Sequence, residues 1–313
     1  MLAERERRAV KEIRVSQPFI LALALNNYDP FFGAEKKNGS KDLDEQVYLQ
    51  VLDYMKTANQ RSVLVLAGGE PFLDPRLKEI LSVANDCGWS TSVDTWAGFG
   101  EQTPSLNQIH QMRLRLLSLN PEKHDELLGE KGNHRRVLAY GERLTNDFPG
   151  EKILVFPICR DNKDEMASIL GWCREHNFRP NMFTVPRQHK HALLLEEYPE
   201  VIQELCALPL QEIIIDTPLL GLHGWPNLCS GGRLAMFIDV DGGVKPCPYF
   251  PYPLCHLDED GVAKAWHSLQ NEVANLNASC SSCSQFASCG GGCLANKTES
   301  GKEYYCPYNE VGK

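Results

Sequence analysis

The residues best suited to chemistry in this sequence are its cysteines, and they are distributed unevenly. Only four of the 12 cysteines lie in the first 228 of the 313 residues, and the other eight lie in the last 85. Clustered thiols in a reducing compartment bind metals more often than they form disulfides. The sequence therefore predicts a metal-binding domain in the carboxy-terminal part, which we expect to begin near Gly221.

The spacing of these cysteines favours one kind of metal site. Four follow one another with two, five and three residues between them and three more flank this run: Cys280, Cys283, Cys289 and Cys293, with Cys229, Cys247 and Cys306. Glycines 290–292 permit positive φ angles and let N–H groups approach cluster sulfurs. A zinc ribbon ordinarily has two paired CxxC knuckles, and only one is present here. We therefore favour iron–sulfur ligation, with zinc as the alternative.

A second motif, LAGGEPFLD at residues 66–74, directly follows a short apolar run. Gly68 and Gly69 would let a ligand approach backbone amides, and Glu70 could accept a hydrogen bond from an amine. In the alternative interpretation the segment is a tight strand-to-helix turn in which Pro71 starts the helix. The residues of this motif alone leave both interpretations open.

The elements that must position these motifs are predicted to be repeated βα units. Six apolar runs alternate with stretches of helical period, which predicts parallel strands at 19–25, 62–66, 90–95, 114–119, 152–158 and 179–185. The fold class is thus α/β, either a barrel or an open sheet. Ligands of such folds gather at the carboxyl ends of the strands, so we expect the chemistry in the loops at 26–41, 67–74, 94–104 and 118–124.

The helical stretches are read from their periodicity. Asp42 is expected to cap the first helix, whose apolar residues recur on one face. Further helices are predicted at 76–84, 135–144, 164–174 and 192–208, followed by a short strand at 212–215. Arg113 and Arg115 are expected on exposed rims of helices or of the barrel.

Charge and hydropathy exclude two classes of partner. The net charge of −9 argues against a surface that binds nucleic acid, because such surfaces are basic. The longest apolar run has seven residues, 19–25, whereas a helix that crosses a membrane needs about 20. The amino terminus mixes acids and bases and has no secretory signal pattern. We therefore expect a cytoplasmic protein that binds neither nucleic acid nor membrane.

Taken together, these residues resemble the radical SAM superfamily with a carboxy-terminal SPASM domain. The GGEP motif matches the family motif that contacts the amine of S-adenosylmethionine, and Ser118, His124 and Gly129 stand where the family has its fourth-strand pattern. The cysteine spacing matches all seven cysteines of the SPASM signature. The resemblance implies a partial (β/α)6 TIM-like barrel over residues 1–220, with a SPASM domain over 221–313. It also implies S-adenosylmethionine binding by Gly68, Gly69, Glu70, Pro71 and Ser118.

The resemblance further implies two auxiliary [4Fe–4S] clusters. One would be held by Cys229, Cys247 and Cys293, and the other by Cys280, Cys283, Cys289 and Cys306. The first of these clusters lacks an evident fourth ligand, because Ala235 stands where relatives often have a cysteine. Either Cys255 supplies that ligand or the site is open to substrate.

The first βα loop departs from the family. Active radical SAM enzymes carry CxxxCxxC there, whereas this loop reads LNNYDPFFGAEKK and no cysteine precedes Cys87. Alignment on the strand puts Asn27, Phe31 and Ala34 at the three cysteine positions. Phenylalanine and alanine donate no metal bond, and Asn27 would be a single weak oxygen ligand. Without that cluster, the family's route to a 5′-deoxyadenosyl radical is closed, so we interpret the barrel as a pseudoenzyme.

Two functional hypotheses remain from the sequence. In the first, a non-catalytic homologue keeps its two auxiliary clusters and joins an active radical SAM protein in a hetero-oligomer. It would then serve as a docking scaffold for a ribosomal precursor peptide or as an electron conduit in peptide maturation. In the second, the chain is a true peptide-modifying enzyme that uses S-adenosylmethionine or an open iron of an auxiliary cluster.

Overall fold

A computed structural model describes residues 15–32, 41–59, 61–99, 106–225 and 228–308. One curved sheet organises these residues, with the strand order β10-β9-β8-β1-β2-β3-β4-β5-β6-β7. The eight strands from β8 to β7 run parallel, whereas β9 pairs antiparallel with β8 and β10 antiparallel with β9. The described chain is therefore an α/β partial barrel, as the sequence predicts.

The bounds of the elements are as follows. The strands are β1 Ile20–Leu23, β2 Val63–Leu66, β3 Ser90–Thr95, β4 Gln111–Arg115, β5 Glu151–Ile158, β6 Arg179–Thr184, β7 Ile214–Ile215, β8 Ala235–Ile238, β9 Gly243–Lys245 and β10 Cys255–His256. The α-helices are α2 Glu45–Thr57, α3 Leu77–Asp86, α4 Pro121–Leu128, α5 Asn133–Asp147, α6 Met166–Glu175, α7 Tyr198–Ala207, α8 Gly261–Leu276 and α9 Phe286–Cys289.

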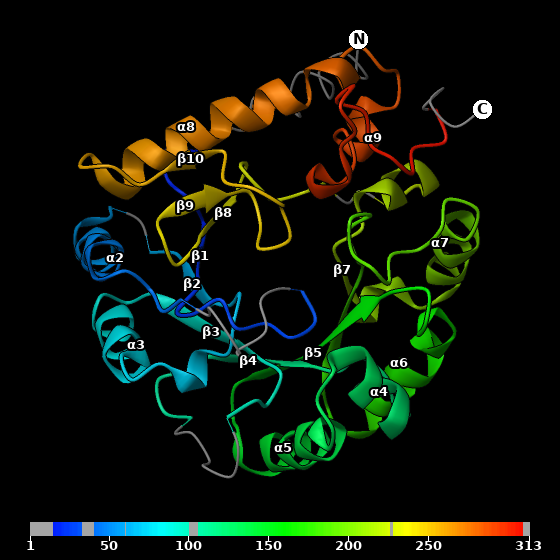
Figure 1. The fold of residues 1–313 in the computed structure, drawn as a ribbon, viewed down its shortest axis with the longest axis horizontal. Coiled ribbons are helices and arrows are strands. Elements are labelled where there is room, and N and C mark those ends of the chain that lie inside the picture. Colours follow the sequence, from blue (N-terminus) through cyan, green and yellow to red (C-terminus); the bar gives the residue numbers. More distant parts are fainter. Residues whose placement is uncertain (1–14, 33–40, 60, 100–105, 226–227, 309–313) are drawn as a thin grey trace.

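The helices surround the sheet in two groups. Helices α2 to α7 lie on the outer face of the curved sheet, and the loops that follow the strands converge near the centre of the ring (Figure 1). Helix α8 runs along β8, β9 and β10, and α9 lies beyond its end, on the side where the sheet is open between β7 and β10 (Figure 1). The carboxy-terminal part thus covers the gap that the partial barrel leaves.

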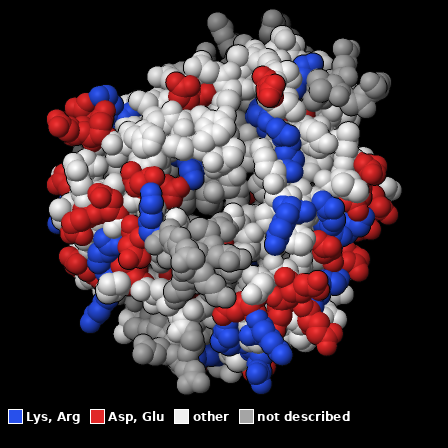
Figure 2. Space-filling view, in the orientation of Figure 1, with Lys and Arg blue, Asp and Glu red and all other residues white. Residues whose placement is uncertain are grey.

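Burial explains why these strands form. Six leucine and methionine side chains of the central strands have no exposed surface: Leu21, Leu23, Leu64, Leu66, Met112 and Leu114. Helices cover one face of the sheet and the barrel interior lies on the other, so continuously apolar strands are favoured. Within the described residues, no helix has the length and apolarity needed to cross a bilayer. Figure 2 shows acidic and basic side chains interspersed around the rim of one face, which is hollowed near its centre.

Four predicted boundaries need correction. Strand β4 spans Gln111–Arg115, not 114–119, because its two arginines have acidic partners inside the barrel and its apolar continuation leaves the sheet. Asp44, not Asp42, caps α2, since its carboxylate accepts from the N–H groups of Gln46 and Val47. The helix expected at 192–208 begins only at Tyr198, and the strand expected at 212–215 is confined to β7.

Candidate functional site

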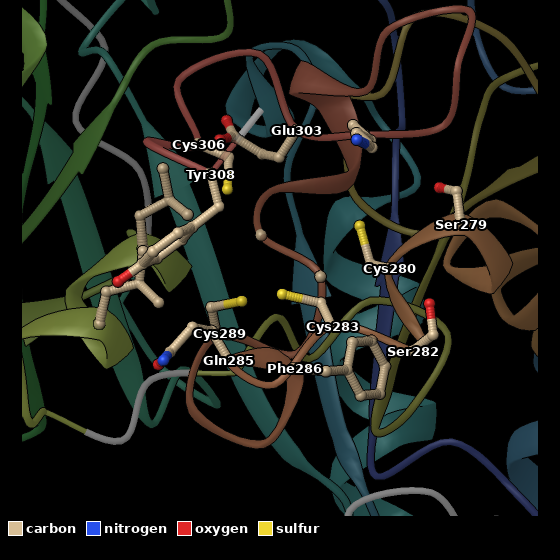
Figure 3. Close-up of a pocket in the computed structure, with 15 residues that line it drawn as sticks. Ser279, Cys280, Ser282, Cys283, Gln285, Phe286, Cys289, Glu303, Cys306 and Tyr308 are labelled. Carbon is tan, nitrogen blue, oxygen red and sulfur yellow. The ribbon is translucent and has the colours of Figure 1, made fainter. Parts of the chain in front are cut away.

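Four cysteines of the carboxy-terminal part surround one cavity of about 190 Å³. Cys280 ends the short 3-10 helix η5 (Ala278–Cys280), Cys289 ends α9, and Cys283 lies between the two helices. Cys306 approaches from the last described segment, and the sulfurs of all four point into the same space (Figure 3). The structure therefore brings together the residues expected to hold the second auxiliary cluster.

Glycines 290–292 shape this centre as the sequence predicts. Their φ angles are +59°, +92° and +78°, a left-handed path that residues with a β-carbon rarely follow. The path turns the N–H groups of Gly291 and Gly292 toward the Cys289 sulfur. Burial raises the pKa of Cys289, and these two N–H donors partly offset the rise. The loop thus supplies the amide contacts to sulfur that iron–sulfur ligands commonly receive.

A second group of three cysteines lies in the same part of the molecule. Burial raises the pKa of Cys247 to about 12, and the neighbouring thiol of Cys229 adds to this rise. The pKa of Cys293 is raised well above its usual value by burial and then by Cys229 and Cys247. Negative charge on these three sulfurs would be mutually repulsive, and bound iron would offset that repulsion. The group fits the first auxiliary cluster.

Cys255 occupies a different place. Its thiol lies 3.6 Å from the carbonyl oxygen of Ala265, near the start of α8. Gly232, three residues after Cys229, packs instead against Val273 of the same helix. Val273 lies eight positions after Ala265, which corresponds to about 12 Å along a helix. The described contacts therefore do not bring Cys255 to the first group.

The arrangement of ligands bears on the identity of the metal. Among the residues that the structure describes, no three His, Cys, Asp or Glu side chains converge closely enough to hold a single metal ion. The cysteines of a [4Fe–4S] cluster each bind a different iron, so their sulfurs stand farther apart than the ligands of one ion do. The choice between clusters and zinc is tested by the metal analysis proposed below.

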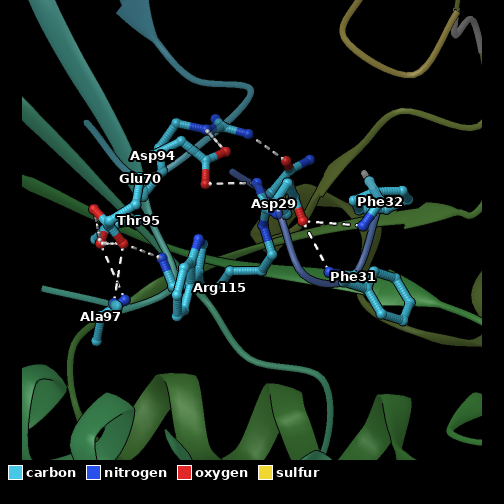
Figure 4. A network of polar contacts seen from close by, with 12 residues as sticks. Asp29, Phe31, Phe32, Glu70, Asp94, Thr95, Ala97 and Arg115 are labelled. Carbon is cyan, nitrogen blue, oxygen red and sulfur yellow. Dashed lines mark hydrogen bonds and ion pairs between the residues drawn. The ribbon is translucent and has the colours of Figure 1, made fainter. Parts of the chain in front are cut away.

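Glu70 of the GGEP motif lies at the carboxyl ends of β2 and β3, with no exposed surface. Both of its carboxylate oxygens accept from the Thr95 hydroxyl, at 2.9 and 2.7 Å (Figure 4). The backbone N–H groups of Phe72, Trp96 and Gly98 donate to the same carboxylate. Burial raises the pKa of Glu70 to about 7, although these bonds lower it. The side chain joins two loops and is not presented to a ligand.

The rest of the GGEP motif is similarly engaged. The Asn26 side chain donates to the Glu70 carbonyl at 2.9 Å and accepts from the Glu70 N–H at 3.0 Å. A β-carbon on Gly69 would lie 2.2 Å from the Asn26 carbonyl oxygen, so only glycine fits there. Pro71 is buried and begins the 3-10 helix η1 (Pro71–Leu73), as the turn interpretation expects, and Gly68 has a φ of +96°. The motif fastens the first βα loop to the second.

Ser118 also serves the fold. Its hydroxyl donates to both oxygens of Glu165, at 2.8 and 2.9 Å, and Ser118 has no exposed surface. Glu165 in turn pairs with Lys123 of α4 at 2.8 Å. The polar groups of Glu70 and Ser118 that would contact S-adenosylmethionine are therefore occupied by protein partners.

The first βα loop, residues 26–32, is held inside the barrel by a buried ion pair. Asp29 Oδ2 accepts from Arg115 Nη1 at 2.5 Å, and Arg115 Nη2 donates to Asp94 at 3.1 Å (Figure 4). Asp29 Oδ1 accepts from the backbone N–H groups of Phe31 and Phe32 at 3.0 and 2.9 Å. The loop is thus tied to β3 and β4. Arg115, expected on an exposed rim, is only 3% exposed.

Phe31 fills the space that this loop encloses. Its side chain is 3% exposed and belongs to a cluster of buried residues with Trp96, Leu117, Leu127, Leu128, Cys159, Val185 and Ala192. His189 Nε2 donates to the Phe31 carbonyl at 2.7 Å. Asn27, expected to be a weak ligand, uses its side-chain oxygen to accept from the Lys41 N–H. Ala34 lies outside the described residues. We call residues 27–32 the aromatic plug.

Sequence reasoning missed the partners that hold the plug. Asp29 and Asp94 are ordinary loop and strand acids in the sequence, and nothing local marks them as partners of one arginine. The residue that could have indicated the ion pair was Arg115 itself. It lies within the run 114–117, which is otherwise apolar, and an arginine in such a run is rarely buried without a partner. Asn26, which binds both backbone groups of Glu70, carried no comparable signal.

Residues 229–289 match the SPASM family model, described as an iron-sulfur cluster-binding domain. The sporulation killing factor maturation protein SkfB of Bacillus subtilis (strain 168) is 22% identical over 250 residues, which cover 74% of this chain and 59% of SkfB. The AdoMet-dependent heme synthase of Methanosarcina barkeri (strain Fusaro / DSM 804) is 23% identical over 298 residues, 79% of this chain and 83% of that protein. The chain thus spans less than two thirds of SkfB.

Solved structures agree with this match. SuiB of Streptococcus suis, bound to the precursor peptide SuiA, aligns with a TM-score of 0.72 and 14% identity over 97% of this chain and 79% of SuiB. SuiB bound to S-adenosylmethionine aligns with a TM-score of 0.68 and 16% identity, over 96% of this chain and 80% of SuiB. The iron–sulfur description thus belongs to the matched residues 229–289, and S-adenosylmethionine is the ligand of the second SuiB structure. Residues 229–289 therefore match an iron–sulfur cluster-binding SPASM domain, and the chain as a whole shares its fold with SuiB.

Proposed function

We propose that this chain is a non-catalytic radical SAM/SPASM homologue that holds two auxiliary [4Fe–4S] clusters. The observation that carries the proposal is the aromatic plug, in which Phe31 is buried and Asp29 is paired with Arg115. A loop with no cysteine, tied down in this way, cannot ligate the cluster that starts the family's radical chemistry. When bound, the auxiliary clusters supply one-electron transfer.

Two cysteine groups support the presence of two clusters. Cys280, Cys283, Cys289 and Cys306 line one cavity, which would give a cluster four thiolate ligands. Cys229, Cys247 and Cys293 lie together as a second group, whereas the described contact of the Cys255 thiol is with the Ala265 carbonyl of α8. We infer that the first cluster has three protein thiolates and one coordination position that the protein cysteines leave open.

The expected partners are a ribosomal precursor peptide and an active radical SAM enzyme. SuiB, which shares the fold, was solved with its precursor peptide, and SkfB is named as the maturation protein of the sporulation killing factor. A homologue without its own radical cluster would need an active enzyme to modify a peptide. The chain would therefore act in a cytoplasmic hetero-oligomer, as a docking scaffold or as an electron conduit.

The alternative function is a true peptide-modifying enzyme. The open position on the first cluster favours it, because an exposed iron can bind a substrate group or act as a Lewis acid. In that case the chemistry would occur in the SPASM domain and would need no radical cluster in the barrel. The two functions differ in what the purified protein can do by itself.

The first test is the metal content after anaerobic purification. Two [4Fe–4S] clusters require about eight irons and eight acid-labile sulfides per chain. The double variant Cys280→Ala/Cys289→Ala should retain about four irons, because it removes two ligands of one cluster. About twelve irons in the wild type would contradict the proposal, since a third cluster would then exist. Zinc counted in the same sample tests the alternative metal.

The second test measures reactivity with S-adenosylmethionine. We expect no 5′-deoxyadenosine when the cluster-loaded protein is incubated with S-adenosylmethionine and dithionite. An active radical SAM enzyme treated in parallel serves as the positive control. Formation of 5′-deoxyadenosine by this chain alone would refute the non-catalytic assignment. Peptide modification without 5′-deoxyadenosine would favour the alternative.

A further inference from the structure

Lys297 makes a contact to a cysteine sulfur that differs in kind from the others. Its Nζ lies 3.4 Å from Cys280 Sγ and donates to it. Cys289 and Cys306, in the same group, accept from backbone N–H groups of Gly291, Gly292 and Tyr308. Backbone amides are neutral donors, whereas a lysine ammonium adds a full positive charge. Cys280 is thus a candidate ligand with a cation directly on its sulfur.

The backbone around Lys297 holds this side chain in position. The Lys297 carbonyl accepts from Arg187 Nη2 at 3.2 Å, and its N–H donates to the Leu294 carbonyl at 3.3 Å. An isolated bridge also pairs Lys297 with Glu303, whose carboxyl it attracts. One local contact and two contacts from other segments therefore fix the base of the side chain. Lys297 is half-buried and lies between the Cys280 sulfur and Glu303.

A cation at this place acts on the redox equilibrium of a bound cluster. One-electron reduction converts [4Fe–4S]²⁺ to [4Fe–4S]⁺ and adds one negative charge to the cluster and its ligands. Positive charge and hydrogen bonds at the sulfurs stabilise the reduced form more than the oxidised form. The ammonium of Lys297 would therefore make reduction easier.

We propose that Lys297 raises the reduction potential of the cluster held by Cys280, Cys283, Cys289 and Cys306. This inference rests on the proposed function, because it requires a cluster at that group. It assigns to Lys297 a positioning role through the Cys280 sulfur, not contact with a substrate. It goes beyond the proposed function by naming a side chain that tunes the second cluster through one of its ligands.

The test is a redox titration of the cluster-loaded protein with dithionite, followed by electron paramagnetic resonance. The variants are Lys297→Met, which removes the charge and the donor, and Lys297→Arg, which keeps both. Lys264→Met is the matched control. Lys264 lies near the start of α8, whereas Cys280 follows the end of that helix, and 55% of the Lys264 side chain is exposed. The variant Cys280→Ala/Cys289→Ala shows which signal belongs to the second cluster.

We expect Lys297→Met to lower the reduced-to-oxidised ratio of the second cluster at a fixed potential about tenfold, or about 59 mV for one electron. Lys297→Arg should stay near the wild-type midpoint, and Lys264→Met should match it. If Lys297→Met lost the iron of the second cluster while Lys297→Arg and Lys264→Met kept it, this result would also support the contact between Lys297 and Cys280. An unchanged midpoint in fully loaded Lys297→Met would overturn this inference and leave the proposed function intact. Wild-type protein without the second cluster would overturn both.

Discussion

Arg115 is the residue on which the interior of the barrel depends. Its guanidinium is buried and contacts two buried carboxylates, Asp29 and Asp94. It also lies over the ring of Phe32, 5.6 Å from the centroid. Charges taken out of water are tolerated only when they are paired, and removal of one partner leaves the others uncompensated. Arg115 therefore links the aromatic plug to the strands.

We predict that Arg115→Met destabilises the protein by about 3 to 5 kcal/mol, the cost of breaking a buried ion pair. Urea unfolding of the cluster-loaded protein measures the loss, and hydrogen exchange at the amides of Phe31 and Phe32 should accelerate. Adding Asp29→Asn should recover part of the stability, because it removes the carboxylate that has lost its cation, whereas Asp94 still pairs with Arg113 at 3.7 Å.

Arg174→Met is the matched control for this prediction. Arg174 pairs with Glu212 on the surface, with 55% of its side chain exposed, so its loss should leave stability nearly unchanged. If Arg115→Met were as stable as Arg174→Met, the plug would not depend on the ion pair.

The residues of the candidate site differ in how well their roles can be predicted from the sequence. The cysteines proposed as cluster ligands can be recognised because spacing within one segment limits how a loop can surround a cluster. Lys297 and Arg115 could not be assigned in this way, since their roles depend on partners brought close by the fold. The Cys280–Lys297 contact joins positions 17 residues apart, and the Asp29–Arg115 pair joins positions 86 apart.

At the scale of elements, α4 and α5 are attached to the sheet through a neutral histidine. His124 Nδ1 accepts from the Leu117 N–H at 3.1 Å, so the proton of the ring lies on Nε2, next to the Asn133 side-chain oxygen at 2.9 Å. Asn133 also donates to the Trp96 carbonyl at 3.0 Å. A second proton on the ring would break the bond to Leu117. This arrangement requires an uncharged imidazole.

Protonation of His124 therefore predicts a loss of stability in acid. Burial lowers its pKa to about 4, whereas an unfolded histidine titrates near 6.5. The unfolded state binds the proton first, so this contribution is complete above pH 6.5 and falls as the pH drops toward 4. The loss between pH 6.5 and 5 should be about 2 kcal/mol.

The measurement compares His124→Asn with the wild type at each pH by the free energy of unfolding. Asparagine can accept and donate without titrating, so the variant should show a flatter decline below pH 6.5. His267→Asn, on the exposed face of α8, should keep the wild-type decline. An equal slope in His124→Asn and the wild type would mean that His124 is already charged in the native state.

The success of the sequence prediction also varied between elements. Strand β3 lies at the predicted residues, and β1, β2, β5 and β6 lie within the predicted ranges or extend one residue beyond them, because buried parallel strands are continuously apolar. β4 was placed too late, since its arginines interrupt the apolar pattern. Helix α4 was not predicted, because its eight residues include four charged side chains and only two leucines.

At the scale of the whole molecule, one sheet joins the barrel to the cysteine-rich part. All four residues of β1 pair with β2 on one side and with β8 on the other. Trp266 of α8 donates from Nε1 to the Val15 carbonyl at 2.9 Å, and Gln50 of α2 donates to the Asp258 carbonyl at 2.9 Å. The division at residues 220 and 221 remains a prediction about sequence domains, and the hydrogen bonds cross it.

We therefore predict that residues 1–220 and 221–313 do not fold well separately. A cut would expose one edge of β1 and one edge of β8, and Leu21, Leu23 and Met236 are fully buried beside them. Unpaired apolar edges promote aggregation. Each part expressed alone should be insoluble or retain few irons, whereas co-expression of both should restore a complex with the iron content of the full chain.

The same connection has a consequence for the clusters. Leu219 of the 3-10 helix η4 (Pro218–His223) lies on the barrel side of the division and lines the cavity of Cys280, Cys283, Cys289 and Cys306. The wall of the proposed second cluster site is therefore built partly by the segment that leaves the barrel. If 221–313 alone bound about eight irons and unfolded at the temperature of the full chain, the barrel would not be needed for the clusters. Because the sheet is continuous, we expect instead that the barrel is required as the support for the SPASM domain.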